Sequence, residues 1–292
     1  MLLRALLAIV VLAACGGDDD APRPPDAPRP LTFGGDRPVE LKVPETLTEG
    51  RRYPLYLVVH AMGINGSSES AYLGVGGLPA ANEALVLAPD GTPNSAGQLF
   101  WNADPACCDF EGRGPDDVAY LGGLLDDIIE TWPVDPSEVY VVGHSNGGFM
   151  AYRLACERAD VVTAIASLAG HASSNAATCQ PSREVHVLHI HGTADATVPY
   201  ASNGGGIGTV GAEGSVLQWG THNGCGTTRT DGAPLDLEAG VPGAETHPHS
   251  TSGCPANGAV DLWEMQGAGH LPNFAPTFTP ALVQWFTDHR RS

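Results

Sequence analysis

The sequence has few basic residues and no motif for a phosphate-bearing ligand. Fourteen Lys and Arg stand against 33 Asp and Glu, which gives a formal net charge of −19 at pH 7. This acidic balance disfavours nucleic acids and anionic lipid surfaces as partners, and it suits a neutral substrate. The chain carries no phosphate-binding loop, no G-x-G-x-x-G after a predicted strand and no zinc signature. We therefore expect no cofactor and no metal.

Internal repeats and a second hydrophobic pattern are also missing, which indicates one globular domain. Only the leader is strongly apolar: residues 1–14 combine a charged start with a short apolar run and predict a signal peptide. Leu12-Ala-Ala-Cys15 resembles a bacterial lipobox, which predicts lipidation of Cys15; the alternative is ordinary secretion with Cys15 lost or idle. Residues 15–30 are polar and proline-rich and predict a flexible tether, which leaves residues 31–292 as a single α/β domain.

The stretch Ser137–Leu154 predicts a short strand, a sharp turn with Ser145 at its apex, and then a helix. Gly143 and Gly147 flank the serine, because a strand that reverses into a helix brings two backbones too close for β-carbons. This strand, turn and helix around G-x-S-x-G form the nucleophile elbow of an α/β-hydrolase. We therefore expect an α/β-hydrolase fold, with a mostly parallel central sheet and helices on both faces, and Ser145 as the nucleophile.

Two residues further along the chain complete a candidate Ser-His-Asp triad. A serine hydroxyl needs a histidine to accept its proton and a carboxylate to orient that histidine. In this fold class the chain order is Ser, then Asp or Glu, then His. Val185–His191 predicts a core strand, and Asp195 follows on the loop at its carboxyl end. Val260–Met265 predicts a second strand, followed by a glycine-rich loop that carries His270.

Acyl transfer also needs two backbone N–H groups that hold the oxyanion, and the loss of one costs about 3–4 kcal/mol in the barrier. One donor is expected from Asn146, directly after the nucleophile. The other is expected from the loop after the strand that begins at Pro54, where His60 precedes Ala61. Ala61 stands where esterases commonly carry glycine, so the second donor is either Met62 or Ala61. We expect His60 to fix this loop through a hydrogen bond.

The other histidines fit structural roles better than catalytic or metal-binding ones. His144 lies beside the nucleophile but points the opposite way in an elbow, so we expect it to pack. His189 and His191 alternate along one predicted strand and share a face, and we interpret them as buried, hydrogen-bonded residues. His247 and His249 resemble a metal clip, but no cysteine or carboxylate stands nearby at ligand spacing. A solvated loop is the favoured interpretation there.

Six stretches in collinear order span about residues 39 to 288 and together resemble the polyhydroxybutyrate depolymerase and feruloyl esterase group of secreted α/β-hydrolases. They are Ala88–Thr92, Trp101–Cys108, Asp116–Leu121, Gly143–Cys156, His191–Tyr200 and Gly267–His270. The resemblance implies that Ser145, Asp195 and His270 are the triad. It also implies that the loop around Trp101 belongs to the active-site rim, where the ring of Trp101 binds substrate. The alternative is that Trp101 anchors that loop from the core.

The cysteine count indicates disulfides. Seven cysteines less the lipidated Cys15 leave six, an even number in an oxidising compartment, so we expect three disulfides. Cys225 and Cys254 each follow a glycine and bracket a loop-rich insertion, and we expect them to pair. The other four cysteines are Cys107, Cys108, Cys156 and Cys179. We expect the adjacent two to bond to the distant two, in an order that the sequence leaves open.

These features together predict a lipid-anchored serine esterase that acts, as a monomer, on a neutral and possibly polymeric carboxylic ester. Its contact with a membrane is expected only through the N-terminal lipid, on the cell surface or in the periplasm. One alternative is a prolyl-oligopeptidase-like peptidase, which the lack of a propeller-sized segment disfavours. The other is a non-catalytic surface-binding lipoprotein on a hydrolase scaffold, which has no need for an intact triad.

Overall fold

The structure is a computed structural model that describes residues 28–81, 83–201 and 209–292. The expected signal peptide, Cys15 and residues 16–27 of the expected tether lie outside the described residues. The end of that tether lies against the domain, because the indole N–H of Trp132 donates to the carbonyl of Pro30 at 2.9 Å. Among the helices in the described ranges, none is both long and apolar enough to cross a membrane.

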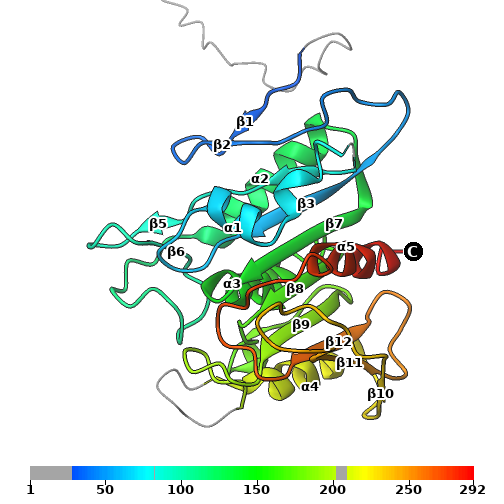
Figure 1. The fold of residues 1–292 in the computed structure, drawn as a ribbon. Coiled ribbons are helices and arrows are strands. Elements are labelled where there is room, and N and C mark those ends of the chain that lie inside the picture. The colour runs from blue at the N-terminus through cyan, green and yellow to red at the C-terminus, as the bar shows by residue number, and fades with distance from the viewer. Residues whose placement is uncertain (1–27, 82, 202–208) are drawn as a thin grey trace, which may run out of the picture.

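An eight-stranded sheet forms the centre of the molecule (Figure 1), with the strand order β10-β11-β12-β9-β8-β7-β3-β4. The six strands from β12 to β4 are parallel, whereas β11 and β10 add an antiparallel edge. The strands are β3 (Tyr53–Val59), β4 (Leu85–Leu87), β7 (Val134–His144), β8 (Ala164–Leu168), β9 (His186–Gly192), β10 (Arg229–Asp231), β11 (Thr246–Thr251) and β12 (Val260–Met265). The expectation of a mostly parallel sheet is confirmed.

Two small hairpins and several helices surround this sheet. The hairpins pair β1 (Thr32–Phe33) with β2 (Val39–Glu40) and β5 (Thr92–Pro93) with β6 (Leu99–Phe100). The α-helices are α1 (Gly66–Tyr72), α2 (Asp117–Thr131), α3 (Asn146–Glu157), α4 (Gly211–Asn223) and α5 (Phe278–Asp288), and the 3₁₀ turns are η1 (Val75–Gly77) and η2 (Ala176–Thr178).

The hydrophobic core is divided into two layers by the sheet. One layer contains Leu121 of α2, Phe149 of α3 and Trp219 of α4, and the other contains Leu282 and Phe286 of α5. Central strands are therefore covered on both faces, and every residue of β9 is buried. Helices on both faces of the sheet were expected, and this too is confirmed.

The segment that carries His247 and His249 is strand β11, so the expectation of a solvated loop there is wrong. His247 lies opposite Glu264 of β12, and His249 lies opposite Asp231 of β10. The imidazole of His249 contacts the carboxylate of Asp231 at 2.7 Å. The pairing depends on strands on either side of β11, which a local pattern of residues does not reveal.

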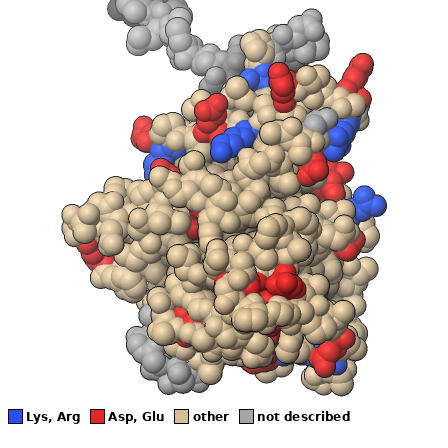
Figure 2. Space-filling model, in the orientation of Figure 1, with Lys and Arg blue, Asp and Glu red and all other residues tan. Residues whose placement is uncertain are grey.

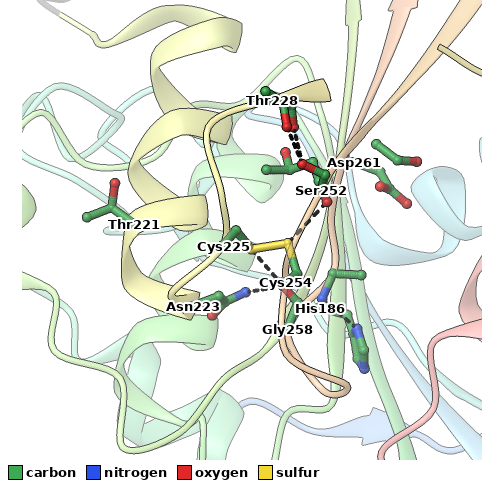
Figure 3. Close-up of a disulfide and its surroundings, with 12 residues drawn as sticks. His186, Thr221, Asn223, Cys225, Thr228, Ser252, Cys254, Gly258 and Asp261 are labelled. Atoms are coloured by element: carbon green, nitrogen blue, oxygen red, sulfur yellow. Dashed lines mark hydrogen bonds between the residues drawn. A yellow bond between two sulfur atoms is a disulfide. The ribbon is translucent and has the colours of Figure 1, made fainter. Parts of the chain in front are cut away.

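The six cysteines in the described ranges form three pairs, of which one agrees with the expected pairing. Cys225, just after α4, is bonded to Cys254, just after β11 (Figure 3). Beside this bridge, the side-chain amide of Asn223 donates to the carbonyl of Gly258 at 3.0 Å. The disulfide therefore ties the end of α4 to the loop before β12.

The expected bonds from Cys107 and Cys108 to Cys156 and Cys179 are wrong, because Cys107 pairs with Cys108 and Cys156 pairs with Cys179. The sulfur of Cys107 lies 3.7 Å from the side-chain amide of Asn146, the first residue of α3. Cys156 comes ten residues later on the same helix, which places it about 15 Å away. Cys107 therefore lies at the start of α3 and Cys156 near its end, whereas bonded cysteines have Cα atoms about 4–7 Å apart.

Candidate active site

Ser145 lies on the tight turn between β7 and α3. Its backbone has φ 54° and ψ −119°, a left-handed conformation that is rare outside glycine. A β-carbon on Gly143 would overlap the carbonyl of Gly147, and one on Gly147 would overlap the carbonyl of Val59. The two backbones therefore approach as closely as expected, and only glycine fits at both positions. The amide of Ser145 donates to the carbonyl of Leu168 at 2.8 Å, which holds the strained turn in place.

The structure brings Ser145, His270 and Asp195 together in one hydrogen-bonded chain. Nε2 of His270 lies 2.9 Å from Oγ of Ser145, and Nδ1 of His270 lies 2.7 Å from Oδ2 of Asp195. The three residues follow β7, β12 and β9, whose carboxyl ends meet at the same edge of the sheet. The imidazole is thus able to accept the serine proton at one nitrogen while its other N–H donates to a carboxylate.

Asp195 is held rigidly and stays ionised. Its Oδ1 accepts from the amides of Thr197 and Val198 at 2.8 and 2.9 Å, which leaves Oδ2 for His270. Burial by itself would raise the pKa of Asp195, but hydrogen bonds from His191 and His270 and the attraction of His270 outweigh it. The net effect lowers the pKa of this carboxyl well below its usual range. The side chain of Asp195 is fully buried, whereas that of His270 is 19% exposed.

Of the expected oxyanion donors, Asn146 and Met62 remain and Ala61 does not. Asn146 is the first residue of α3, so its backbone N–H has no carbonyl partner within the helix. The N–H of Ala61 instead donates to the carboxylate of Glu69 at 3.0 Å. An amide that is bonded to a buried carboxylate is not available to an oxyanion, so the inclusion of Ala61 is wrong. Met62 is left as the second candidate on this loop.

Glu69 and His144 form a buried pair that contacts the loops carrying Ala61 and His270. His144 donates from Nε2 to the backbone carbonyl of His270 at 2.8 Å, while its Nδ1 lies 3.9 Å from Glu69. Burial, together with repulsion from His270, lowers the pKa of His144 to about 4, so this imidazole is neutral. Burial also raises the pKa of Glu69 to about 7. No sequence signal marks Glu69, which lies in a short polar helix.

Trp101 is a core anchor, so its expected role in substrate binding is wrong. Its side chain is fully buried, and its indole N–H donates to the carbonyl of His60 at 3.1 Å. The side chain of Asn146 accepts from the backbone N–H of Trp101 at 2.7 Å and donates to its carbonyl at 2.9 Å. The tryptophan therefore joins the two loops that carry the oxyanion candidates, and presents no face to a ligand.

His60 fixes the same region through both of its ring nitrogens, as expected for a structural role. Nδ1 contacts the carbonyl of Ala61 at 2.8 Å, and Nε2 accepts from the amide of Gly91 at 2.9 Å. These contacts tie the loop after β3 to the segment before β5. The ring of His60 also packs on Trp101, with the two centroids 4.9 Å apart.

A pocket of about 430 Å³ lies beside α3. Phe149 and Tyr152 of α3, Trp219 of α4 and the Cys156–Cys179 disulfide contribute to its wall, which also includes His171. His171 belongs to a cluster with His189 and His191, the group of residues in the described ranges that is placed to hold a metal ion. These aromatic side chains and the imidazole share the wall with polar and charged residues that include Asp104, Arg153 and Glu157.

The chain is similar in sequence to known feruloyl esterases. No protein-family model matches the chain. Feruloyl esterase B of Piromyces equi is 30% identical over 247 residues, which cover 80% of this chain and 42% of that protein. Feruloyl esterase D of Neurospora crassa is 26% identical over 69% of this chain and 68% of that protein. The chain therefore spans about two fifths of the Piromyces relative, and the resemblance to feruloyl esterases is confirmed.

Solved structures share the architecture. The acetyl xylan esterase from Aspergillus awamori has a TM-score of 0.58 at 17% identity, and the match covers 86% of this chain and 94% of that one. A thermostable esterase has a TM-score of 0.59 at 15% identity, over 89% of this chain and 62% of that one. Likeness at such low identity establishes a common fold.

Proposed function

The chain has the α/β-hydrolase fold and is related in sequence to feruloyl esterases, and from this premise we propose that it hydrolyses carboxylic esters through Ser145. The observation that carries the proposal is the hydrogen-bonded chain from Ser145 through His270 to Asp195, at 2.9 and 2.7 Å. In this arrangement each group has the neighbour that its role in acyl transfer requires.

Acylation begins when Nε2 of His270 accepts the Oγ proton of Ser145 as Oγ attacks the ester carbonyl. The backbone N–H groups of Asn146 and Met62 stabilise the oxyanion of the tetrahedral intermediate. Asp195 remains ionised and stabilises the imidazolium of His270 through Nδ1–H. His270 then protonates the leaving alcohol, and the acyl group stays on Ser145.

Deacylation repeats these steps with water as the nucleophile. His270 accepts a proton from the water while the water oxygen attacks the acyl carbonyl. The same two amides stabilise the second oxyanion. Collapse of this intermediate returns the proton from His270 to Oγ of Ser145 and releases the carboxylic acid.

We assign the substrate to neutral carboxylic esters: feruloyl or acetyl esters of polysaccharide, or short polyhydroxyalkanoate chains. The feruloyl class is supported by the names of the sequence relatives. A neutral substrate suits a protein of formal charge −19, and the face drawn in Figure 2 is mostly uncharged, with charged side chains concentrated towards its upper part.

We also propose that residues 1–14 direct export and that a lipid on Cys15 anchors the protein to a bacterial membrane. Three cysteine pairs in the globular domain suit an oxidising compartment. Replacement of Cys15 by Ser would then release the protein from the membrane fraction. An unchanged distribution between membrane and soluble fractions would contradict the anchor.

The function is tested by incubating the protein with methyl ferulate, hydroxybutyrate oligomers, acetylated xylan fragments and a proline-containing peptide. Products are identified by mass spectrometry, with Ser145→Ala as the blank and Ser95→Ala, at an exposed serine, as the matched control. We expect the wild-type protein and the Ser95→Ala variant to release one acid, and the Ser145→Ala variant to release none. Cleavage of the peptide alone would favour the peptidase.

A fluorophosphonate probe separates catalysis from binding, since it reacts only with an activated serine. We expect it to label the wild-type protein and the Ser95→Ala variant, and to leave Ser145→Ala unlabelled. A folded wild-type protein that never reacts would contradict the esterase and favour a surface-binding role.

A further inference from the structure

Three buried histidines lie together beside Asp195, which His191 contacts at 3.3 Å. His189 and His191 alternate along β9 and therefore share one face of the sheet. His171 reaches the same place from the segment that follows β8, the neighbouring strand. Each of the three side chains is at most 1% exposed. The proposed ester hydrolysis assigns no role to this cluster.

The nitrogens of the cluster lie close together. Nε2 of His189 and Nδ1 of His191 are 3.0 Å apart. His171 stacks against both rings, with its centroid 5.0 Å from that of His191 and 5.8 Å from that of His189. One nitrogen from each residue lies within 4.8 Å of the others.

His171 is the unusual member, because neither of its ring nitrogens has a hydrogen-bond partner in the structure. A buried polar atom without a partner costs about 1–3 kcal/mol, so such groups call for an explanation. The imidazole faces two other imidazoles and borders the pocket beside α3. A buried imidazole that has no partner and lies beside two other imidazoles is a candidate metal ligand.

The facing nitrogens of His189 and His191 share a hydrogen bond at 3.0 Å, which a metal ion would replace, and the far nitrogen of each ring contacts an oxygen. Nε2 of His191 lies 2.8 Å from the carbonyl of Val198 and 3.3 Å from Oδ2 of Asp195, so it carries the proton and Nδ1 does not. Nδ1 of His189 lies 2.8 Å from the hydroxyl of Tyr152, an oxygen that is able to donate or accept. Such oxygen partners on the far nitrogen are typical of histidines that bind metals.

We propose that His171, His189 and His191 form a tetrahedral zinc site, with a water from the pocket as the fourth ligand. Zn–N distances of about 2.0–2.1 Å place ligand nitrogens about 3.3 Å apart, close to the 3.0 Å between His189 and His191. The ligand nitrogen of His171 needs to move by about 1.5 Å at most towards the other two nitrogens. Rotation of the His171 side chain breaks none of its own hydrogen bonds. When zinc is bound, His189 carries its proton on Nδ1 and donates to Tyr152.

Charge and access are compatible with this site. The ionised carboxylate of Asp195 lies 3.3 Å from Nε2 of His191, so its negative charge offsets part of the positive charge of the ion. Because His171 and Tyr152 line the pocket beside α3, an ion has a path from solvent.

The test measures metal binding and does not depend on ester hydrolysis. Full-length protein is stripped with a chelator and titrated with ZnCl₂ by calorimetry, and Co²⁺ is added separately to record its visible absorption. His171→Phe removes one ligand without removing a hydrogen bond. His249→Ala is the matched control, since His249 lies outside the cluster and contacts two carboxylates, those of Asp231 and Glu264.

We expect one Zn²⁺ per chain, a tetrahedral Co²⁺ spectrum, and binding weakened by about 100-fold or more in His171→Phe and unchanged in His249→Ala. No saturable Zn²⁺ binding by the wild-type protein would overturn the proposal, as would loss of binding in His249→Ala alone. X-ray absorption of the zinc-loaded wild-type protein needs no variant. Three imidazole ligands support the site, and any smaller number refutes it.

Discussion

The carboxylate of Glu69 accepts a hydrogen bond from the backbone N–H of Ala61, at 3.0 Å, in the interior of the protein. Nδ1 of His144 lies 3.9 Å from the same carboxylate, and His144 in turn donates to the backbone carbonyl of His270. Glu69 thus contacts the loop after β3 directly and reaches the backbone of His270 through His144. Its protonation state affects the stability of this part of the fold.

Stability is expected to fall with rising pH because of Glu69. Burial raises its pKa from the ordinary 4.5 to about 7, so the folded protein binds this proton more tightly than the unfolded chain does. The free energy of unfolding therefore decreases between about pH 4.5 and pH 7, by about 3 kcal/mol. Glu69→Gln removes the titration. Urea denaturation should therefore show that the free energy of unfolding of the variant rises relative to that of wild type between about pH 5 and pH 8.

The control for this measurement is Glu45→Gln, at an exposed position. The difference in free energy of unfolding between this variant and wild type should be the same at about pH 5 and about pH 8. If Glu69→Gln also differs from wild type by a constant amount, Glu69 does not titrate in this range, and the structural argument for its raised pKa is wrong.

Asp195→Asn should lower kcat by about 10⁴-fold at neutral pH and leave the fold intact. The amide of asparagine is able to donate to Nδ1 of His270, which stabilises the tautomer that cannot accept the serine proton. Steady-state hydrolysis of methyl ferulate measures the effect. Asp231→Asn, at a carboxylate that is 82% exposed, should leave kcat unchanged. Equal activity of the two variants would remove Asp195 from the proposed mechanism.

Asn146→Ala should destabilise the protein more than it slows the chemistry. The variant leaves the buried N–H of Trp101 unpaired, which costs about 1–3 kcal/mol, while the backbone N–H of residue 146 remains. Thermal melts and kcat are measured on the same preparation, with Asn102→Ala as the control for loss of a partly buried side-chain bond. A 100-fold fall in kcat with unchanged stability would assign the side chain to the chemistry itself.

Peptide mapping without reduction should find Cys156 linked to Cys179, and Cys225 linked to Cys254. Cross-linked peptides that join Cys107 or Cys108 to Cys156 or Cys179 would contradict the structure. The double variant Cys225→Ser, Cys254→Ser opens a loop closed over 29 residues, which should cost about 3–4 kcal/mol in the free energy of unfolding. Denaturation of this variant beside wild type measures that cost.

Much of the fold and of the candidate site could be predicted from the sequence because it depends on local chemistry. The elbow around Ser145 follows from glycines that a tight strand-to-helix turn requires, and these are visible within five residues. Asp195 and His270 each follow a segment in which apolar residues mark a strand, with Val187, Leu188 and Ile190 in β9 and Val260, Leu262 and Trp263 in β12. Since parallel strands end at one edge of a sheet, their order along the chain was enough to predict that the three residues meet.

The tertiary structure alone decided what each side chain faces across the fold. Ala61 is excluded as an oxyanion donor by Glu69, which packs beneath the loop from α1, and Trp101 is buried by contacts with His60 and Asn146. His171 meets His189 and His191 only because β8 and β9 are neighbours in the sheet. Periodicity and turn residues report on the local backbone, whereas such contacts depend on the packing of segments that lie far apart in the sequence.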